Sequence, residues 1–582
     1  MSSDNKDALL NEARAWAADD SDPNTLEALR RAIAAEDLDS IREGFDSPLE
    51  FGTAGLRGLL GFGPGRMNLV TVGRATAGLA QQLIADVPDA LDRGVVVGRD
   101  ARRMSTEFAK TVAELLAGYG FQVFWNPEPV PTPVAAFAGR HLNAAATVVV
   151  TASHNPPEYN GYKVFSERGS QIVSPQDKKI HQGMLGLESL RDLPRVSFDE
   201  GLECGKILPL GSEMEEAYLK SLSAQCVGPT QPPAQVRCVT TALHGVGHYW
   251  IDKALRARGY EELYPVEAQA QPDGGFPTVR FPNPEEEGAL DLALSEARAQ
   301  NADLILANDP DTDRLCVAVR APELDAGYHV LSGNDLGVLL ADWLLRKKKE
   351  AGTLPDGALV VTTVVSTTML ASIAKVYGVE SYEVLTGFKW IWDKALSKSE
   401  EGGVFIFGFE EALGYCVGPA VRDKDGIGAA QVLMELASDL KSKGLSLSDR
   451  LEELWRTHGL HATKQVATVL PGAEGKARIA EIMAALRKSP PKSIAGVPVL
   501  RYRDLIGAGA DEEGLPRSNV LTWWLEGRER VVLRPSGTEP KLKVYLEACA
   551  PLEEGDSLDS ARVSAGDRLD ELAQWARDLV AA

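Results

Sequence analysis

The stretch "TVVVTASHNPPEYNGYKVF", from Thr147 to Phe165, places an apolar run directly before a polar, turn-rich segment. A run such as "TVVV" is typical of a buried strand, and the Asn, Pro and Gly residues that follow are turn signals. The same order recurs in "VVVGRDAR", "LILANDPDTD" and "VFIFGFEEALGY". Helical patterns such as "EFAKTVAELLAGYG" and "TTMLASIAKVYG" alternate with these runs, so the sequence predicts βαβ units and an α/β fold with parallel sheets. Because ligands bind outside the carboxyl ends of strands in such sheets, the four loops predict one site assembled from several domains.

The chain is too long for one hydrophobic core, since its length corresponds to roughly three to five domains. Its last part, with "VVLRPSGTEPKLKVYLEA" and a closing amphipathic helix, is typical of a smaller α+β domain. The apolar face of that helix contains Leu569, Leu572, Trp575 and Leu579. Linker-like segments near "ILPLGSEME", "RAPELDAGYH" and "WRTHGLH" place the predicted domains at 1–208, 209–326, 327–458 and 459–582.

A net charge of -22 argues against a broad nucleic-acid or anionic-membrane surface, because such partners require an excess of Lys and Arg. The cysteines are scattered without a CxxC pair, which favours free thiols in a reducing compartment. No apolar run approaches the roughly 18 residues of a membrane-spanning helix, and the start "MSSDNKDALL" has no apolar signal segment. We therefore expect a cytoplasmic protein that binds neither nucleic acid nor membrane.

Three carboxylates alternate in "NDPDTDR", at Asp309, Asp311 and Asp313. In extended backbone these residues face the same side, so their carboxylates can converge on one hard cation. A calcium loop of the EF-hand type requires glycine and glutamate at the positions held here by Arg314 and Arg320, so that interpretation fails. A Mg²⁺ site that shares a phosphate oxygen fits better. The alternative from the residues alone is an acidic, solvated loop.

Ser153 and His154 stand at the end of the "TVVV" strand. Ser153 is not in a GxSxG elbow, and in an extended chain the two side chains would point to opposite faces. His154 is then a poor general base for Ser153, and a serine-hydrolase triad is disfavoured. From the residues alone, Ser153 is equally a turn or cap residue and His154 a hydrogen-bonded structural histidine.

Two further segments combine charged groups with turns. In "RPSGTEPKLKV" a guanidinium, two hydroxyls, free backbone N–H groups and a lysine suit a phosphate dianion, although a capped strand connection has the same pattern. The residues concerned are Arg534, Ser536, Gly537, Thr538 and Lys541 or Lys543. In "GFEEALGY" the carboxylates of Glu410 and Glu411 can bind sugar hydroxyls or can simply begin a helix. Two interpretations, ligand contacts or plain turns, stay open for Gly387, Phe388, Lys389, Lys424 and Asp425. Arg57 and Arg99 could each belong to the site or simply lie on the surface.

Together these motifs resemble those of the α-D-phosphohexomutase family of phosphoglucomutases and phosphomannomutases. "TASHNP" is similar to the family's phosphoserine loop, "DPDTDR" to its metal loop, "GFEEALGY" to its sugar-binding loop and "RPSGTEP" to its phosphate-binding loop. The resemblance covers nearly the whole chain, from "FGTAGLRG" to "RPSGTEPKLKVY". It implies four domains around a central cleft, three of related α/β build and a C-terminal α+β domain.

The resemblance also implies roles for individual residues. Ser153 would carry a phosphoryl group and contact Mg²⁺ together with Asp309, Asp311 and Asp313. Lys163 would act as the general acid-base, with a pKa lowered by burial near a metal and other cations, and His154 and Arg57 would complete the catalytic set. Substrate binding falls to Arg314, Gly387, Phe388, Lys389, Glu410 and Lys424. The non-reacting phosphate would be bound by Arg534, Ser536, Gly537, Thr538 and Lys543.

The expected activity is that of a phosphoglucomutase, which interconverts glucose 1-phosphate and glucose 6-phosphate through glucose 1,6-bisphosphate. Ala412 stands where the family's sugar loop commonly has serine, and the pattern is most similar to a branch that also contains phosphopentomutases and glucose 1,6-bisphosphate synthases. Phosphopentomutase and phosphomannomutase therefore stay open, as do a metal-dependent phosphatase and a non-catalytic binding module. The expected partners are small sugar phosphates, and the expected assembly is a monomer or homodimer.

Overall fold

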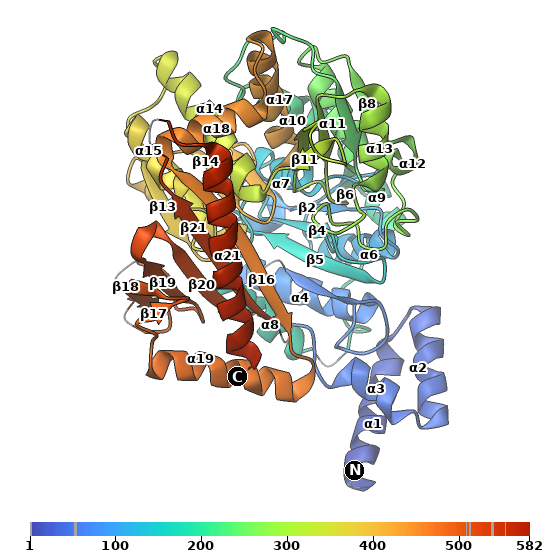
Figure 1. Ribbon diagram of the computed structural model, residues 1–582. Helices are drawn as coiled ribbons and strands as arrows, with labels where there is room; N and C mark the ends of the chain where they lie inside the picture. Colours follow the sequence, from blue (N-terminus) through green and yellow to red (C-terminus); the bar gives the residue numbers. More distant parts are fainter. Residues whose placement is uncertain are drawn as a thin grey trace. The chain divides into compact units, whose positions relative to one another are not determined.

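The computed structural model describes residues 3–51, 55–187, 189–507, 509–510, 514–536, 541–552 and 555–581, with no account of the side chains of Ser3, Asp4 and Ala473. The chain divides into two compact units (Figure 1). The first contains Met1–Val330 and Gly414–Glu435, and the second contains Leu331–Leu413 and Leu436–Ala582. Among the described residues, no helix is both long and apolar enough to cross a membrane.

The first unit opens with three helices that have their own small core. They are α1 (Ser3–Asp19), α2 (Pro23–Ala35) and α3 (Leu38–Phe45). The rings of Trp16 and Phe45 pack edge to face with their centroids 5.8 Å apart, and Leu29 and Ile41 are fully buried in the same core. The same core includes Val70 of α4 (Leu69–Asp86), so the N-terminal helices pack on the first α/β domain.

The first sheet is mixed, with strand order β1-β5-β4-β2-β3-β6. Its strands are β1 (Leu56–Leu59), β2 (Val95–Arg99), β3 (Val123–Trp125), β4 (Ala146–Val150), β5 (Tyr159–Phe165) and β6 (Ile207–Pro209). The remaining helices of this domain are α5 (Ala90–Arg93), α6 (Ser105–Gly118), α7 (Thr132–His141), α8 (Gln176–Leu185) and α9 (Phe198–Glu203). Strand β2 is parallel to β3 and β4, whereas β5 returns antiparallel to β4. Because Arg99 is paired with Val150, the loops after β2 and β4 leave the same edge of the sheet.

The second sheet of the first unit has the order β11-β10-β9-β7-β8. Its strands are β7 (Cys238–Thr241), β8 (Leu263–Pro265), β9 (Leu304–Ala307), β10 (Cys316–Arg320) and β11 (Tyr328–Val330). This part of the first unit also contains four helices, α10 (Ser212–Ser223), α11 (Gly247–Arg256), α12 (Glu267–Ala270) and α13 (Asp291–Gln300). Two elements from later in the chain belong to the same unit: β15 (Gly414–Val417) and the start of α17 (Gly426–Ser442). Strand β9 is parallel to β7 and leads directly into the three aspartates.

The second unit contains one parallel and one antiparallel region. Strand β12 (Ala358–Thr363) lies parallel to β13 (Glu380–Val384) and β14 (Val404–Glu410), with α14 (Gly333–Glu350), α15 (Met369–Tyr377), α16 (Phe388–Glu400) and α18 (Leu447–His458). The antiparallel sheet has the order β16-β21-β20-β19-β18-β17. Its elements are β16 (Leu460–Val469), α19 (Gly472–Lys488), β17 (Ser493–Ile494), β18 (Val497–Asp504), β19 (Leu521–Leu525), the 3-10 helix η1 (Glu526–Arg528), β20 (Arg530–Pro535), β21 (Lys541–Ala550) and α21 (Leu558–Ala581).

The expected α+β character of the last domain is confirmed. Helix α21 lies against β16 and β21 (Figure 1). Leu569 and Leu572 of this helix are buried in the sheet's core, and Trp575 and Leu579 pack on it. The apolar face predicted from the sequence therefore covers one side of the antiparallel sheet.

Segment 414–435 groups with the first unit, although the predicted third domain spans 327–458. The physical reason is a set of buried polar contacts: Arg258 pairs with Glu435, and the Tyr218 hydroxyl donates to both carboxylate oxygens of Asp425 at 2.9 and 3.1 Å. Asp425 Oδ1 also accepts hydrogen bonds from the N–H groups of Ile427 and Gly428 at 3.0 Å each, so it caps the start of α17. The plain-turn interpretation of Asp425 thus describes its place in this structure.

Burial raises the pKa of Asp425 to about 6, against the lowering effect of these hydrogen bonds. The pKa of Asp425 in the folded protein lies above the ordinary value of 3.8, so this carboxyl ionises at a lower pH in the unfolded chain. The free energy of unfolding therefore decreases as pH rises from about 4 to about 6. We expect Asp425→Asn to stabilise the protein by about 1–3 kcal/mol at pH 7.5 and to leave stability unchanged near pH 4. Calorimetric Tm values of both proteins at the two pH values test this. A lower Tm for the variant at pH 7.5 would show that the native state needs the charge.

Candidate active site

Ser153 is buried near the start of the loop that follows β4, with 1% of its surface exposed. Its φ is +52°, a left-handed conformation that is uncommon for a residue with a side chain. The Ser153 hydroxyl donates to Asp309 Oδ2 at 2.7 Å and lies 3.3 Å from His154 Nδ1. The expectation that Ser153 and His154 point to opposite faces is therefore wrong, because it assumed an extended backbone.

A buried arginine that the sequence analysis did not single out positions this loop. The Arg102 guanidinium donates to the carbonyls of Ser153 and Pro156 at 2.6 and 2.8 Å, and to those of Asn155 and Tyr159. Arg102 also lies 3.2 Å from Asp100, whose carboxylate accepts from the hydroxyls of Thr151 and Ser105. The strained serine loop is thus supported by a pair of opposite charges at the end of β2.

Replacing Arg102 with methionine should disturb both catalysis and stability. The variant keeps a long side chain but loses every donor to the serine loop and leaves Asp100 buried without its partner. We expect kcat to fall by about 100-fold, because a small displacement of Ser153 suffices for that loss, and stability to fall by about 3 kcal/mol. Steady-state kinetics and thermal unfolding measure the two effects.

Arg103→Met is the matched control, since Arg103 is exposed and contacts only the margin of the loop, through the Pro157 carbonyl at 3.3 Å. Equal losses in Arg102→Met and Arg103→Met would refute a specific role for Arg102.

The three aspartates come together as predicted. Asp309, Asp311 and Asp313 are each 0% exposed, and one carboxylate oxygen of each lies within 4.8 Å of the others. Thr132, at the start of α7, donates its hydroxyl to Asp311 Oδ2 at 2.6 Å and its N–H to the Asp311 carbonyl at 3.0 Å. Among the described residues, Asp311 Oδ1 and Asp313 Oδ1 have no hydrogen-bond partner. Buried carboxylate oxygens of this kind fit a hard divalent cation, so the triad can hold Mg²⁺.

Cationic side chains surround the triad. Lys163 Nζ donates to Asp311 Oδ2 at 2.6 Å and to Asp313 Oδ2 at 2.8 Å, and Lys424 Nζ lies 2.9 Å from Asp313 Oδ2. The backbone N–H of Arg314 donates to Asp309 Oδ1 at 3.1 Å, and its guanidinium Nε lies 3.9 Å from Asp309 Oδ2 and from Asp313 Oδ1. Burial lowers the pKa of Arg57, on β1, and the negative charges of Asp311 and Asp313 partly oppose this shift. The structure thus places four of the predicted catalytic and substrate-binding residues around the carboxylates.

The protonation states follow from this charge pattern. Burial lowers the pKa of Lys163, but the carboxylates of Asp311 and Asp313 outweigh it and the net pKa is raised, so the lowered value expected from the sequence is not found. Burial first, then Arg314 and Arg57, hold the pKa of His154 well below its usual value, so His154 is neutral at neutral pH. Burial and the repulsion of Asp311 and Asp313 raise the pKa of Asp309 to about 8.

The second unit carries the predicted sugar-binding loop. Glu410 Oε1 accepts a hydrogen bond from the N–H of Gly387 at 2.6 Å, and Gly387 has a φ of +117° at the start of α16. Phe388 is 3% exposed, whereas Lys389 is partly exposed beside it. The structure therefore brings Gly387 to Glu410, and Phe388 anchors the helix that follows.

The predicted phosphate-binding residues lie on the β20–β21 hairpin. Arg534 and Lys543 are direct cross-strand partners, so their side chains leave the same face of the hairpin. The N–H of Ser536 donates to the Lys541 carbonyl at 2.7 Å. Gly537 and Thr538 lie outside the described residues. Arg534 also hydrogen-bonds to Tyr545, whose pKa is raised by burial and by Glu411.

Arg99, in contrast, is structural. Its guanidinium donates to the carbonyls of Asn126 and Pro127 at 2.9 and 2.8 Å and to the Thr106 hydroxyl. The sequence did not indicate that Arg102 would hold the serine loop or that Thr132 would hold Asp311. Arg102 is one of several arginines near this loop, and Thr132 resembles an ordinary residue at the start of a helix. Asp100 lies in the quoted "GRDAR" loop and could have been considered there.

Family models match all four domains of the chain. The descriptions are phosphoglucomutase/phosphomannomutase alpha/beta/alpha domain I (residues 48–190), domain II (216–322) and domain III (332–458), and the C-terminal domain (521–564).

Three relatives span most of the chain. A "Probable phosphomannomutase" of Haemophilus influenzae is 40% identical over 83% of this chain and 93% of its own length. A "Phosphopentomutase" of Homo sapiens is 36% identical over 94% and 92%, and a "Phosphoglucomutase" of Staphylococcus aureus is 34% identical over 88% and 91%. The family models and the mutases among these relatives show that the protein is a phosphosugar mutase, an enzyme of the isomerase class. The chain belongs to the phosphoglucomutase/phosphomannomutase family, within the α-D-phosphohexomutase superfamily.

Proposed function

We propose that the protein is a phosphoglucomutase that works through a phosphorylated Ser153. The observation that carries the proposal is the buried contact of the Ser153 hydroxyl with Asp309 at 2.7 Å, beside two carboxylate oxygens without a hydrogen-bond partner among the described residues. Phospho-Ser153 donates its phosphoryl group to the free hydroxyl of a glucose monophosphate. The Ser153 Oγ–P bond breaks, a bond from phosphorus to the sugar oxygen forms, and the hydroxyl proton ends on Ser153 Oγ. The product is glucose 1,6-bisphosphate, whose other phosphate then returns to Ser153.

Asp309, Asp311 and Asp313 would hold Mg²⁺ for this transfer. A bound cation neutralises charge on the phosphoryl oxygens as they move. The chain's own contribution is positioning, because Arg102 fixes the serine loop and Thr132 fixes Asp311.

Proton transfer would be divided between two residues of the first unit. Lys163 is charged in this arrangement and can donate a proton or stabilise a developing negative charge. His154 is neutral and lies 3.3 Å from Ser153 Oγ, so it can accept a proton at this atom. Arg57 and Arg314 would add positive charge near the transferring group.

Recognition of the sugar phosphate would be the task of the second unit. Glu410 would bind sugar hydroxyls. Lys389 lies two residues after Gly387, whose N–H donates to Glu410. Arg534, Ser536 and Lys543, together with the predicted Gly537 and Thr538, would bind the phosphate that is not reacting. Arg534 and Lys543 present two positive charges on one hairpin face, which suits a phosphate dianion.

Phosphopentomutase is the second candidate activity. Ala412 removes one hydroxyl from the sugar-binding loop, and the phosphopentomutase of Homo sapiens matches 94% of this chain. A loop with one fewer polar contact to a hexose would discriminate less against a pentose.

A coupled assay with Mg²⁺ and a trace of glucose 1,6-bisphosphate tests the choice between these activities. We expect a higher kcat/KM for glucose 1-phosphate than for ribose 1-phosphate and for mannose 1-phosphate. Preference for the ribose ester would assign a phosphopentomutase, and preference for the mannose ester a phosphomannomutase. Release of inorganic phosphate in place of an isomer would indicate a phosphatase and refute the mutase cycle.

A further inference from the structure

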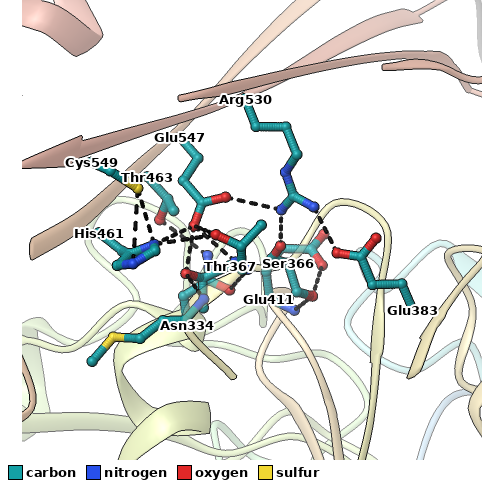
Figure 2. Close-up of polar contacts among 12 residues, drawn as sticks. Asn334, Ser366, Thr367, Glu383, Glu411, His461, Thr463, Arg530, Glu547 and Cys549 are labelled. Atoms are coloured by element: carbon teal, nitrogen blue, oxygen red, sulfur yellow. Dashed lines mark hydrogen bonds and ion pairs between the residues drawn. The ribbon is translucent and has the colours of Figure 1, made fainter. Parts of the chain in front are cut away.

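The second unit contains a buried network of charged and polar side chains outside the residues proposed to touch substrate. Its centre is the ion pair of Arg530 and Glu547, which are direct cross-strand partners on β20 and β21. Their side chains are 2% and 3% exposed, and Arg530 Nη2 lies 3.1 Å from Glu547 Oε2. Figure 2 shows Arg530 between Glu547, Glu383 and the loop at Ser366. A buried pair of this kind fixes geometry even where it adds little net stability.

The pair is connected to the segment that follows β12. Glu547 Oε1 accepts hydrogen bonds from the Thr367 hydroxyl at 2.7 Å and from the N–H and hydroxyl of Thr368 at 2.9 and 3.1 Å. Arg530 donates to the Ser366 carbonyl and, at 2.9 Å, to Glu383 at the end of β13. The ion pair therefore holds Ser366, Thr367 and Thr368 through direct hydrogen bonds.

The same segment positions the sugar-binding loop. The Ser366 hydroxyl donates to Glu411 Oε2 at 3.1 Å and accepts from the Glu411 N–H at 3.2 Å, while Thr363 contacts both groups. Glu411 adjoins Glu410, the proposed sugar ligand. At the other end, Arg530 precedes Arg534 by four residues on β20, so both side chains leave the same face of the strand. Tyr545 pairs with Val532, which lies between Arg530 and Arg534 on β20. Burial and the charge of Glu411 raise the pKa of Tyr545, and Tyr545 hydrogen-bonds to Arg534.

The alternative for part of this network is a metal site, because one donor atom each of His461, Glu547 and Cys549 lie within 4.8 Å of one another. His461 Nε2 lies 3.3 Å from an Arg528 guanidinium nitrogen, which can only donate, so the proton of a neutral His461 is on Nδ1. His461 Nδ1 then donates to Glu547 Oε1 at 2.9 Å and is not available as a ligand. Glu547 Oε1 already accepts from Thr367 and Thr368. The hydrogen bonds of His461 and Glu547 Oε1 therefore argue against a metal site at these three residues.

We propose that the Arg530–Glu547 pair is a positioning element that couples the sugar-binding loop to the phosphate-binding hairpin through Ser366 and Glu411. The inference rests on the proposed roles of Glu410 and Arg534. Its function is to hold the two recognition elements in one arrangement while the bisphosphate turns over, because a mutase must retain this intermediate through both transfers. Weakening the pair should therefore release the intermediate and weaken substrate binding without altering the phosphoserine centre of the first unit.

Three variants test the coupling. Glu547→Gln keeps acceptor atoms for Thr367 and Thr368 but removes the charge that holds Arg530. Ser366→Ala removes the hydroxyl that contacts Glu411 and leaves the carbonyl that accepts from Arg530. Cys549→Ala is the matched control, since Cys549 lies on the same face of β21 and contacts His461, with Sγ 3.2 Å from Nδ1.

We expect Glu547→Gln and Ser366→Ala each to raise KM for glucose 1-phosphate by about tenfold and to increase release of glucose 1,6-bisphosphate per turnover, with kcat at saturating bisphosphate changed much less. The double variant should show no larger effect than either single variant, because both interrupt one route. Cys549→Ala should behave like the wild type. The phosphorylated fraction of Ser153, measured by intact-protein mass spectrometry, should be the same in all variants.

Unchanged KM in folded variants, or effects that multiply in the double variant, would overturn the coupling and leave only a structural role for the pair. These outcomes are distinct from failure of the proposed function, which would appear as absence of mutase activity in the wild type itself. Should Glu547→Gln fail to fold, Ser366→Ala alone still decides the question through its KM and its release of bisphosphate.

Discussion

Ser153→Ala should abolish isomerisation of the sugar phosphate, with an expected loss in kcat/KM of about 10⁴-fold or more. Ser153 Oγ is the group that would carry the phosphoryl, and no other described hydroxyl donates to Asp309 in this structure. The measurement is the coupled assay with added glucose 1,6-bisphosphate, together with intact-protein mass spectrometry for the phosphoryl group.

Ser166→Ala is the control for this variant. Ser166 is also a buried serine of the first unit, but its hydroxyl donates to the Ser170 carbonyl at 3.2 Å, away from the aspartates. We expect this variant to keep both its activity and the phosphoryl group on Ser153. Retention of mutase activity by Ser153→Ala, or a phosphoryl group still present on that variant, would assign the transfer to another residue.

Asp311→Asn should reduce the affinity for Mg²⁺ by about 100-fold or more, because it removes one of the three buried carboxylates that would bind the cation. The asparagine oxygen still accepts from Thr132, so the loop is expected to keep its conformation. In the wild type, Mg²⁺ should raise Tm by binding the native state, and this gain should disappear in the variant. Calorimetric titration with Mg²⁺ and Tm with and without Mg²⁺ measure the two effects.

The pH dependence of Mg²⁺ binding gives a second test of the same triad. Because the pKa of Asp309 is raised to about 8, its proton competes with the cation, and the apparent affinity should fall as pH decreases below about 8. Binding at neutral pH should therefore release a proton to the buffer. Asp425→Asn serves as the control, since it changes a buried carboxylate of the same unit outside the triad. An equal loss of Mg²⁺ affinity in Asp425→Asn, or affinity that is independent of pH, would argue against the triad as the metal site.

Much of the fold and half of the site could be predicted from local sequence. The apolar runs that precede polar loops correctly predicted β2, β4, β9 and β14, because strand period and turn chemistry are local properties. The alternation of Asp309, Asp311 and Asp313 likewise predicted their convergence, since neighbouring residues on one short loop cannot separate far. The closing amphipathic helix predicted the cover of the last sheet in the same way.

The local rules failed where the backbone departs from regular geometry or where a residue acts on a distant loop. Ser153 and His154 approach each other because Ser153 adopts a left-handed conformation, which no period of the sequence indicates. The pKa of Lys163 is raised and not lowered, because its side chain meets two carboxylates that lie far away in the sequence. Arg102 gave no signal at all, since its function depends on carbonyl groups about 50 residues further along the chain.

The sequence by itself determined the family, the order of the strands and loops along the chain, and the residue types that could carry phosphate, metal and sugar. Only the tertiary structure decided which of these residues meet. Ser153 reaches Asp309 across 156 residues, and Arg530 reaches Ser366 across 164. Such contacts depend on how parallel strands are ordered in each sheet and on how the hairpin of the last domain pairs with itself, which local propensity does not encode. The donors that orient a buried carboxylate become visible only when the chain has folded around it.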